Sequence, residues 1–173
     1  MMYVAIIAMA ILASFIGLSV WQFGLLESYS SYAEKWKDRY PIHNTNIWSV
    51  VTAVVAILMA IAFIDKLDGN PLQFLGFLAP VYLGVVACTP EYKKKHKQRV
   101  AHYIGVSCCV VAFLSLVIFG MHLWWLPLVC IAGFFFLLGL PTRSVAKSWV
   151  LWLQCAGFAT AFVVLMAKTP IGG

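Results

Sequence analysis

The chain has 173 residues, of which 63% are hydrophobic and only 10% are charged, and its mean hydropathy is +0.92. Soluble domains carry roughly half apolar and a quarter charged residues, so this composition excludes an ordinary soluble protein and predicts an integral membrane protein. The net charge of +6 comes from basic residues that flank apolar runs and form no groove-reading motif, which argues against nucleic-acid binding and favours anionic lipid headgroups as partners.

Six apolar runs predict an all-α polytopic membrane protein, a single domain over residues 1–173 built as a bundle of six transmembrane helices. A helix of roughly 20 residues crosses the hydrocarbon core of a bilayer. The first run follows no basic segment and contains no cleavage motif, so we expect it to be retained as a span. Three small residues at helical spacing within it, Ala10, Ser14 and Gly17, let another helix approach closely. The predicted spans cover about residues 2–26, 47–64, 72–88, 100–121, 123–140 and 149–166.

The polar connector 27–46 predicts a short helix that lies in the membrane interface. Ser31 followed by Glu34 fits a capping box at its start. Two interpretations stay open for the helix: an aromatic belt that anchors it in depth, or a lid over a ligand site. Its membrane-facing side would carry three aromatic residues that recur every four positions, Tyr32, Trp36 and Tyr40.

The third run, 72–88, carries Gly76, Pro80 and Gly84 on one helical face. Pro80 has no backbone donor and its ring crowds the carbonyl of Gly76, so the helix should bend or open locally between these two residues. The alternatives are a static kink packed by its neighbours and a hinge or cavity wall.

The most polar stretch of the chain, 89–103, separates the third run from the fourth. Thr89 before Pro90 is typical of a helix cap followed by a first-turn proline, so we expect the fourth helix to begin at Pro90 and continue unbroken to Gly120. Its first turns would project from the bilayer and present four lysines to anionic headgroups, namely Lys93, Lys94, Lys95 and Lys97.

The distribution of basic residues predicts an orientation in a cell (inner) membrane. The first, third and fifth connectors hold every Lys and Arg of the chain except Lys66 and Lys168. Because basic residues concentrate on the cytoplasmic side, these connectors should be cytoplasmic, and both termini should lie outside.

The sequence shows no pattern of catalytic or metal-ligating residues. No Asp, Glu, Lys or Arg lies inside a predicted span, and the histidines are scattered. Acid–base and metal chemistry requires several such groups at one depth. The five cysteines fall in apolar runs without metal-ligand spacing. We therefore predict no catalytic residue, metal or cofactor, and leave open an enzyme that acts on lipid headgroups near Glu91, His96 and His102.

His102 is the one ionisable side chain expected to be partly buried near the bilayer. Burial and the neighbouring Arg99 both disfavour the imidazolium, so we expect a neutral ring that donates one hydrogen bond and accepts another. An interfacial histidine bonded to a carbonyl or a headgroup is the alternative. The candidate ligand-binding residues belong to the third run and the turn that follows it: Gly76, Pro80, Gly84, Arg99, His102 and Tyr103.

Several short strings resemble a group of small, uncharacterised multi-pass membrane proteins of Bacteroidetes-type gut bacteria and their phages and prophages. The strings are SYSSY at 28–32, QFLGFL at 73–78, GVVACTPEYK at 84–93 and VAHY at 100–103. The resemblance implies that the third span, the basic turn and His102 define the group. It also implies a phage-related role, such as altering the host membrane against superinfection.

These observations favour a non-enzymatic membrane protein that binds or moves a small apolar or lipidic molecule, or docks a membrane partner, through a cavity beside Pro80. The alternative is an oligomeric channel or a phage-type membrane modulator. Membrane lipids are the expected partners, and a homo-oligomer stays open.

Overall fold

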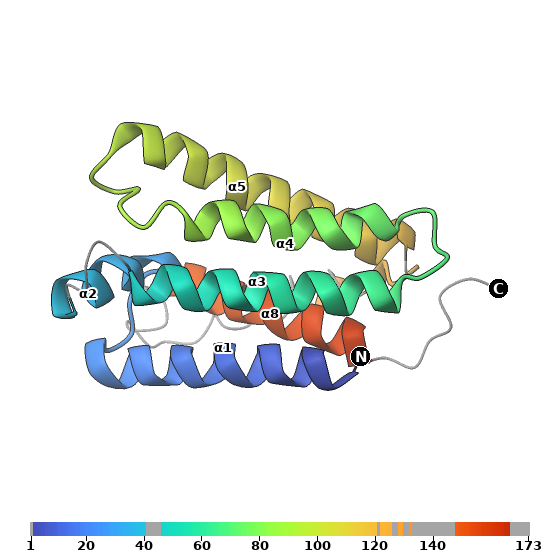
Figure 1. Ribbon diagram of the computed structural model, residues 1–173, viewed down its shortest axis with the longest axis horizontal. Helices are drawn as coiled ribbons and strands as arrows, with labels where there is room; N and C mark the ends of the chain where they lie inside the picture. The colour runs from blue at the N-terminus through green and yellow to red at the C-terminus, as the bar shows by residue number, and fades with distance from the viewer. Residues whose placement is uncertain are drawn as a thin grey trace.

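The computed structural model describes residues 2–40, 46–120, 122–125, 128–129, 132 and 148–166. These residues form an all-α protein, as predicted, and Figure 1 shows its long helices lying side by side. The six α-helices are α1 (Met2–Phe23), α2 (Tyr32–Arg39), α3 (Ile47–Lys66), α4 (Gln73–Ala87), α5 (His96–Ser115) and α8 (Trp149–Met166). Two shorter elements accompany them, the 3₁₀ turn η1 (Tyr29–Ser31) and the π-helical segment η2 (Leu116–Gly120).

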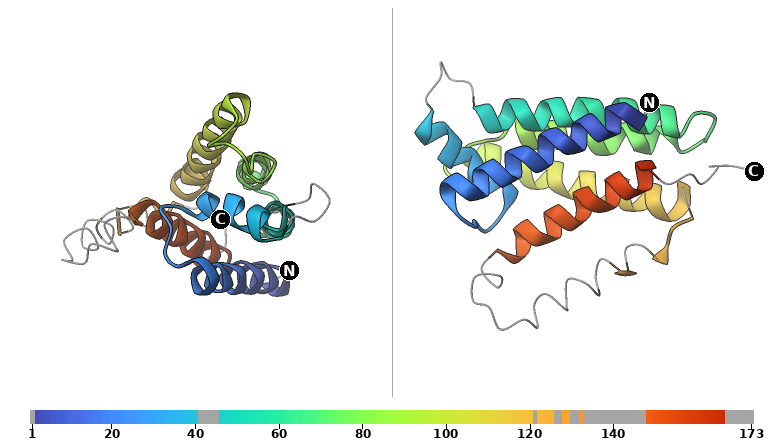
Figure 2. Two further views of the ribbon diagram at one scale, coloured as in Figure 1. Left: turned by 90° about the vertical axis from the view of Figure 1, so that its left-hand side faces the viewer. Right: turned by 90° about the horizontal axis from the view of Figure 1, so that it is seen from below.

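Helix α3 is central to the bundle. It packs against α1 on one side and against α4 on the other, while α5 pairs with α4, and α8 contacts both α1 and α3. The two views of Figure 2 show the same order from the end of the bundle and from below. Short connections between sequential helices explain why α3, α4 and α5 are neighbours in space as well as in sequence.

Four of the described helical stretches are long and apolar enough to cross a membrane: Met2–Phe23, Ile47–Lys66, His96–Gly120 and Trp149–Met166. The predicted third span is the 15-residue helix α4, which at 1.5 Å per residue is about 22 Å long, shorter than a hydrocarbon core of about 30 Å. Most of the predicted fifth span, 123–140, lies outside the described residues. The structure thus supports a multi-pass membrane protein with four candidate spans, and the expected count of six is not reached.

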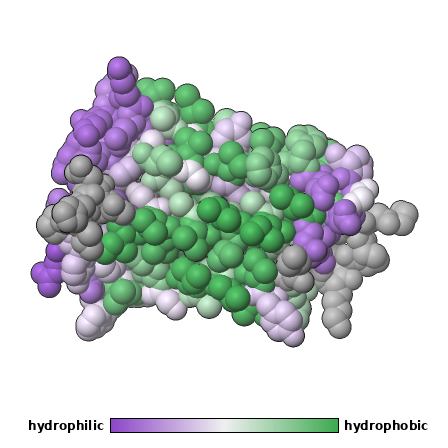
Figure 3. Space-filling view, viewed as in Figure 1, coloured by the Kyte–Doolittle hydropathy of each residue, from purple (hydrophilic) through white to green (hydrophobic). Residues whose placement is uncertain are grey.

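The surface of the bundle fits a lipid environment. On the face seen in Figure 3, hydrophobic residues cover the middle and hydrophilic residues gather at the two ends. Large apolar side chains in the middle of the helices are turned outward, such as Ile57, which is 60% exposed, and Val111, which is 63% exposed. A soluble monomer rarely exposes apolar surface on this scale, whereas lipid tails cover it without cost.

Helix α4 continues through Pro80 without unwinding, so the local opening expected between Gly76 and Pro80 is absent. Gly76 packs tightly against the C-terminal end of α3, because a Cβ atom placed there would be 2.6 Å from Leu67 Cδ1 and 3.0 Å from Phe63 Cβ. Gly84, by contrast, faces open space, with no heavy atom within 4 Å of such a Cβ. The close packing of Gly76 on α3 holds the N-terminal half of α4 in place beside the proline.

The helix after the basic turn begins later than predicted, at His96 and not at Pro90. The hydroxyl of Thr89 donates back to the carbonyl of Val86 (2.8 Å) and contacts His102, so its bonds are to α4 and α5 and not to the backbone N–H groups that follow it. The backbone N–H of Glu91 donates instead to the side chain of Gln98 (2.9 Å). Residues 90–94 consequently form turns.

Helix α2 is present as predicted, but its aromatic face is buried in protein and does not face lipid. Trp36, only 4% exposed, stacks on Phe15 of α1, and its Nε1 donates to Ser19 Oγ (2.8 Å). The hydroxyl of Tyr32 donates to the carbonyl of Gly24 (2.8 Å), the positive-φ glycine just beyond the end of α1. The aromatic-belt interpretation is therefore wrong for Tyr32 and Trp36, since both side chains are buried and form hydrogen bonds with α1 or with the residue that follows it.

The capping box predicted at Ser31 is not formed, because the Ser31 side chain makes no cap bond to α2. Ser28 is the capping residue instead, and its hydroxyl accepts from the backbone N–H of Ser31 at the start of η1 (3.3 Å). The first turn of α2 is also tied to α3 through Asn46, whose amide donates to the carbonyl of Ala33 (2.7 Å) and accepts from the N–H of Trp48 (2.9 Å). These bonds hold η1 and α2 across one end of the bundle.

Candidate functional site

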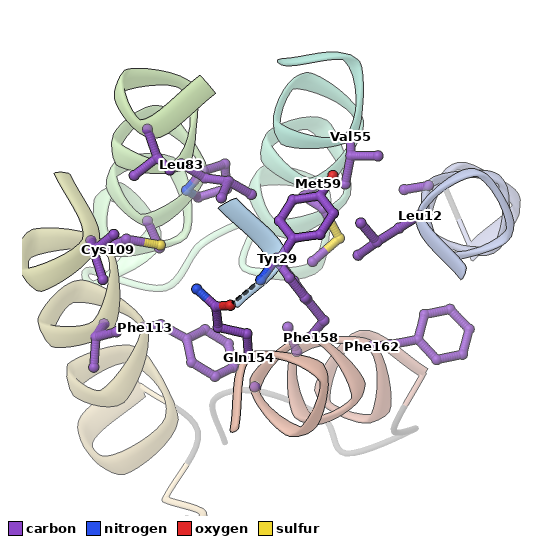
Figure 4. A pocket seen from close by; sticks show the side chains of 18 of the residues that line it. Leu12, Tyr29, Val55, Met59, Leu83, Cys109, Phe113, Gln154, Phe158 and Phe162 are labelled. Carbon is purple, nitrogen blue, oxygen red and sulfur yellow. Dashed lines mark hydrogen bonds between the residues drawn. The ribbon is translucent and has the colours of Figure 1, made fainter. Parts of the chain in front are cut away.

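A cavity of about 290 Å³ lies between the helices, lined by residues of α1, η1, α3, α4, α5 and α8. Figure 4 shows apolar side chains converging on it from these elements, including Leu12, Met59, Leu83, Phe113 and Phe158. No charged side chain is found among the described lining residues, and the polar ones come from η1 and α8: Tyr29, Ser30 and Gln154. Such a cavity suits an apolar, uncharged molecule, because burying a charge there without a partner is costly.

Tyr29 lines the cavity and is held by two helices. Its hydroxyl lies 2.9 Å from Thr52 Oγ1, and since the Thr52 hydroxyl donates to the carbonyl of Trp48 (2.7 Å), Tyr29 is the donor. Burial raises the pKa of the Tyr29 phenol well above its ordinary value of 10, so the phenol stays protonated. The phenol thus keeps the proton that it donates to Thr52, and this bond anchors η1 to α3.

Gln154 of α8 anchors the same turn from the other side. Its Oε1 accepts from the backbone N–H of Tyr29 (2.8 Å), and this bond identifies the other amide atom as nitrogen. Figure 4 shows that nitrogen, Nε2, on the side of the amide that faces Cys109 across the cavity. Within the described part of the chain, Nε2 has no hydrogen-bond partner. The cavity therefore contains one available amide NH₂ group, with two N–H donors, on an apolar wall.

The ligand-binding residues predicted from the third span are separated by the structure. Pro80 lines the cavity together with Ala79, Leu83 and Val86 of α4. Gly76 packs on α3 instead, and Gly84 does not contribute to the lining. The cavity beside Pro80 is present, but larger α4 side chains form its wall in place of the expected glycine face.

His102, Arg99 and Tyr103 lie around the α4–α5 turn and do not line the cavity. The His102 ring is 3% exposed, stacks on Tyr92 with ring centroids 3.9 Å apart, and places Nδ1 2.9 Å from Thr89 Oγ1. Because the only hydroxyl proton of Thr89 is directed to the carbonyl of Val86, Nδ1 must carry the proton that it donates to Thr89. The bonded partner of His102 is thus a residue of the turn itself.

Arg99 also supports the turn, since its guanidinium donates to the carbonyls of Lys93 (2.9 Å) and Tyr92 (3.4 Å). The Tyr103 side chain is 59% exposed and meets Tyr92 edge to face, with ring centroids 6.3 Å apart. Both residues therefore contact the turn, and Arg99 helps to hold its conformation.

One ion pair joins the basic turn to α2, and a second joins it to the segment before η1. Glu91 binds both Lys37 of α2 and Lys95, and Lys93 pairs with Glu27 (3.4 Å). The hydrogen bonds from Lys37 and from Lys95 lower the pKa of the Glu91 carboxyl from 4.5 to about 2. Lys94 and Lys97 are exposed, and neither has an ion-pair partner among the described residues. Only part of the predicted headgroup-binding set is thus free of intramolecular partners.

The described residues form no metal site, and they do not bring Glu91 and His102 together for the enzyme alternative. No group of three or more His, Cys, Asp or Glu side chains among them could hold a metal ion. Glu91 points to Lys37 and Lys95, and His102 to Thr89, so the two side chains do not form an acid–base pair. Comparison of the chain with protein-family models, with curated proteins and with solved structures found no match.

Gln154 is a polar cavity residue that the sequence analysis did not place among the candidate ligand-binding residues. It is a polar residue in an otherwise apolar run, which is equally well explained by a hydrogen bond between helices, and it does make such a bond to Tyr29. The additional feature, an amide nitrogen on a cavity wall, depends on packing between segments 125 residues apart. No local pattern could have indicated it.

Proposed function

We propose that this protein is a non-enzymatic membrane protein that binds or moves a small apolar or lipidic molecule in the cavity between its helices. The observation that carries the proposal is the cavity itself, with its uncharged and almost wholly apolar lining. An apolar cavity of about 150 Å³ accommodates benzene, so about 290 Å³ corresponds to roughly a dozen non-hydrogen atoms. A compact apolar molecule or part of a lipid chain is of this size.

Filling the cavity should weaken the binding of an apolar probe. Gly157 lines the cavity, and no heavy atom lies within 4 Å of where its Cβ would be, so a Gly157→Leu side chain takes up space that the probe needs. We expect the affinity for naphthalene, measured by equilibrium binding to protein in phosphatidylcholine nanodiscs after subtraction of empty nanodiscs, to fall about fivefold or more.

The matched control is Gly17→Leu. Gly17 also has no heavy atom within 4 Å of its Cβ position, but it does not line the cavity. Its replacement should leave the affinity for naphthalene unchanged. Wild-type protein that binds no naphthalene above the nanodisc background, or equal losses in the two variants, would contradict the proposed function.

We propose that the end of the bundle formed by α2 and the α4–α5 turn faces the cytoplasm. Apart from Lys66, at the opposite end of α3, the Lys and Arg residues that the structure describes lie at this end. Figure 1 places the N-terminus at the other end. The positive-inside rule then puts the N-terminus and the C-terminal end of α8 outside. Lys94 and Lys97 are the lysines available to anionic headgroups.

The orientation can be tested by cysteine labelling in intact cells, in a background from which the five native cysteines have been removed. Exposed Cys88 makes this background necessary, because it lies at the same end as the turn. We expect a membrane-impermeant maleimide to label Asp68→Cys directly and Lys94→Cys only after permeabilisation. Direct labelling of Lys94→Cys with protection of Asp68→Cys would reverse the topology.

The alternative function, an oligomeric channel or a phage-type membrane modulator, is favoured by one observation. The small-residue face of α1 is turned outward, with Ala10, Ser14 and Gly17 all exposed. Small residues allow close helix approach in lipid, so a second copy of the chain is the partner proposed for this face. A single protein mass in nanodiscs, unchanged with protein concentration, would argue against this alternative.

A further inference from the structure

We infer that the occupant of the cavity is a neutral molecule with an apolar body and a single hydrogen-bond acceptor, such as a carbonyl or ether oxygen, that binds Gln154 Nε2. This inference rests on the proposed function and adds the chemical class of the ligand. A purely apolar occupant would leave the amide N–H groups of Gln154 without a partner in an apolar surrounding, which costs free energy.

The other polar groups of the lining are already engaged. The Tyr29 hydroxyl donates to Thr52, and the Tyr29 backbone N–H donates to Gln154 Oε1. The Ser30 hydroxyl lies 3.3 Å from that of Ser28. Gln154 Nε2 is therefore the polar lining group that makes no hydrogen bond within the described part of the chain, and it can only donate. A ligand group that accepts is complementary to it, whereas a carboxylate or ammonium group would be buried without an opposite charge.

The position of Gln154 also sets the direction of the ligand. It lies in the second turn of α8, next to η1 and close to the end that carries α2. Phe162 lies eight residues further along α8, about 12 Å at 1.5 Å per residue, and also lines the cavity. Phe63 and Phe113 complete this distant, apolar part of the lining. The acceptor group thus points to the α2 end, and the apolar body extends away from it.

Two probes of similar shape test the inference, acetylnaphthalene and isopropylnaphthalene substituted at the same ring position. The first has a carbonyl oxygen where the second has a methyl group. We expect the ratio of their affinities for wild-type protein in phosphatidylcholine nanodiscs to exceed the same ratio for Gln154→Leu by about 3- to 10-fold, because one buried hydrogen bond is lost. Differences in membrane partitioning cancel in this comparison.

Gln73→Leu is the matched control, since Gln73 Nε2 donates to the carbonyl of Ile64 (2.7 Å) and does not line the cavity. It should keep the wild-type ratio. In addition, the infrared carbonyl band of acetylnaphthalene bound to wild-type protein should shift to lower frequency than in lipid, a measurement that needs no variant to fold.

The outcomes separate the inference from the proposed function. If both probes bind wild-type protein with an affinity ratio that Gln154→Leu does not change, or with an unshifted carbonyl band, the acceptor-group inference is wrong while an apolar binding site remains. If neither probe binds above the nanodisc background, the proposed function fails, and the inference fails with it.

Discussion

Replacing Trp36 by alanine is expected to lower the free energy of unfolding by about 3–5 kcal/mol, the usual cost of truncating a buried aromatic side chain. Trp36 is 4% exposed and packs between two aromatic residues of α1, with ring centroids 5.2 Å from Phe15 and 5.3 Å from Phe23. Its loss also removes the hydrogen bond to Ser19 Oγ. Reversible unfolding in mixed detergent micelles, followed by circular dichroism, measures the change.

Trp21→Ala provides the control, because Trp21 lies on the same helix α1 that Trp36 packs against but is 80% exposed. We expect a change within about 0.5 kcal/mol for this variant. The comparison distinguishes an α2 whose aromatic face packs on α1 from an α2 whose aromatic face lies in lipid. If its aromatic face lay in lipid, as the sequence suggested, the two substitutions would have similar effects.

Replacing Gly76 by valine should destabilise the α3–α4 pair by about 1–3 kcal/mol, the usual cost of overpacking a core. Even the first added carbon would lie 2.6 Å from Leu67 Cδ1 and 3.0 Å from Phe63 Cβ. Both neighbours are fully buried, with at most 1% of their surface exposed, so neither can move aside freely. The same unfolding measurement in micelles tests this expectation.

Gly84→Val, two helical turns further along α4, is the matched control for Gly76. No heavy atom lies within 4 Å of its Cβ position, so the substitution meets no steric obstacle. We expect it to be tolerated, with a change within about 0.5 kcal/mol. Equal destabilisation by the two variants would show that α4 does not approach α3 through Gly76.

The class of the protein and most of its helices could be predicted from the sequence because their causes are local. The backbone N–H and C=O groups of a helix form hydrogen bonds within the helix itself. The preference of a side chain for lipid or water depends on that side chain alone. The apolar runs therefore predicted α1, α3 and α8 well, and the polar stretch after α1 predicted α2. The concentration of charge in alternate connectors was visible in the same way.

Tertiary structure decided which hydrogen-bond and packing partners the polar and aromatic side chains have. Thr89 matched a helix cap by sequence, but its hydroxyl contacts His102 and the carbonyl of Val86, and α5 begins at His96. Trp36 matched a membrane-facing aromatic residue, but Ser19 and Phe15 of α1 draw it inward. In each case the sequence allows several hydrogen-bond partners for the same polar group, and only the packing of the helices determines which partner is used.

The candidate site itself came from packing alone. A cavity is the space that side chains from six elements leave between them, and its volume follows from rotamers and helix positions that no periodicity encodes. The sequence by itself determined that a polar residue, Gln154, lies in an apolar helix. Only the tertiary structure decided that its oxygen meets the backbone of Tyr29 and its nitrogen faces the cavity, because a glutamine amide takes whichever orientation its neighbours satisfy.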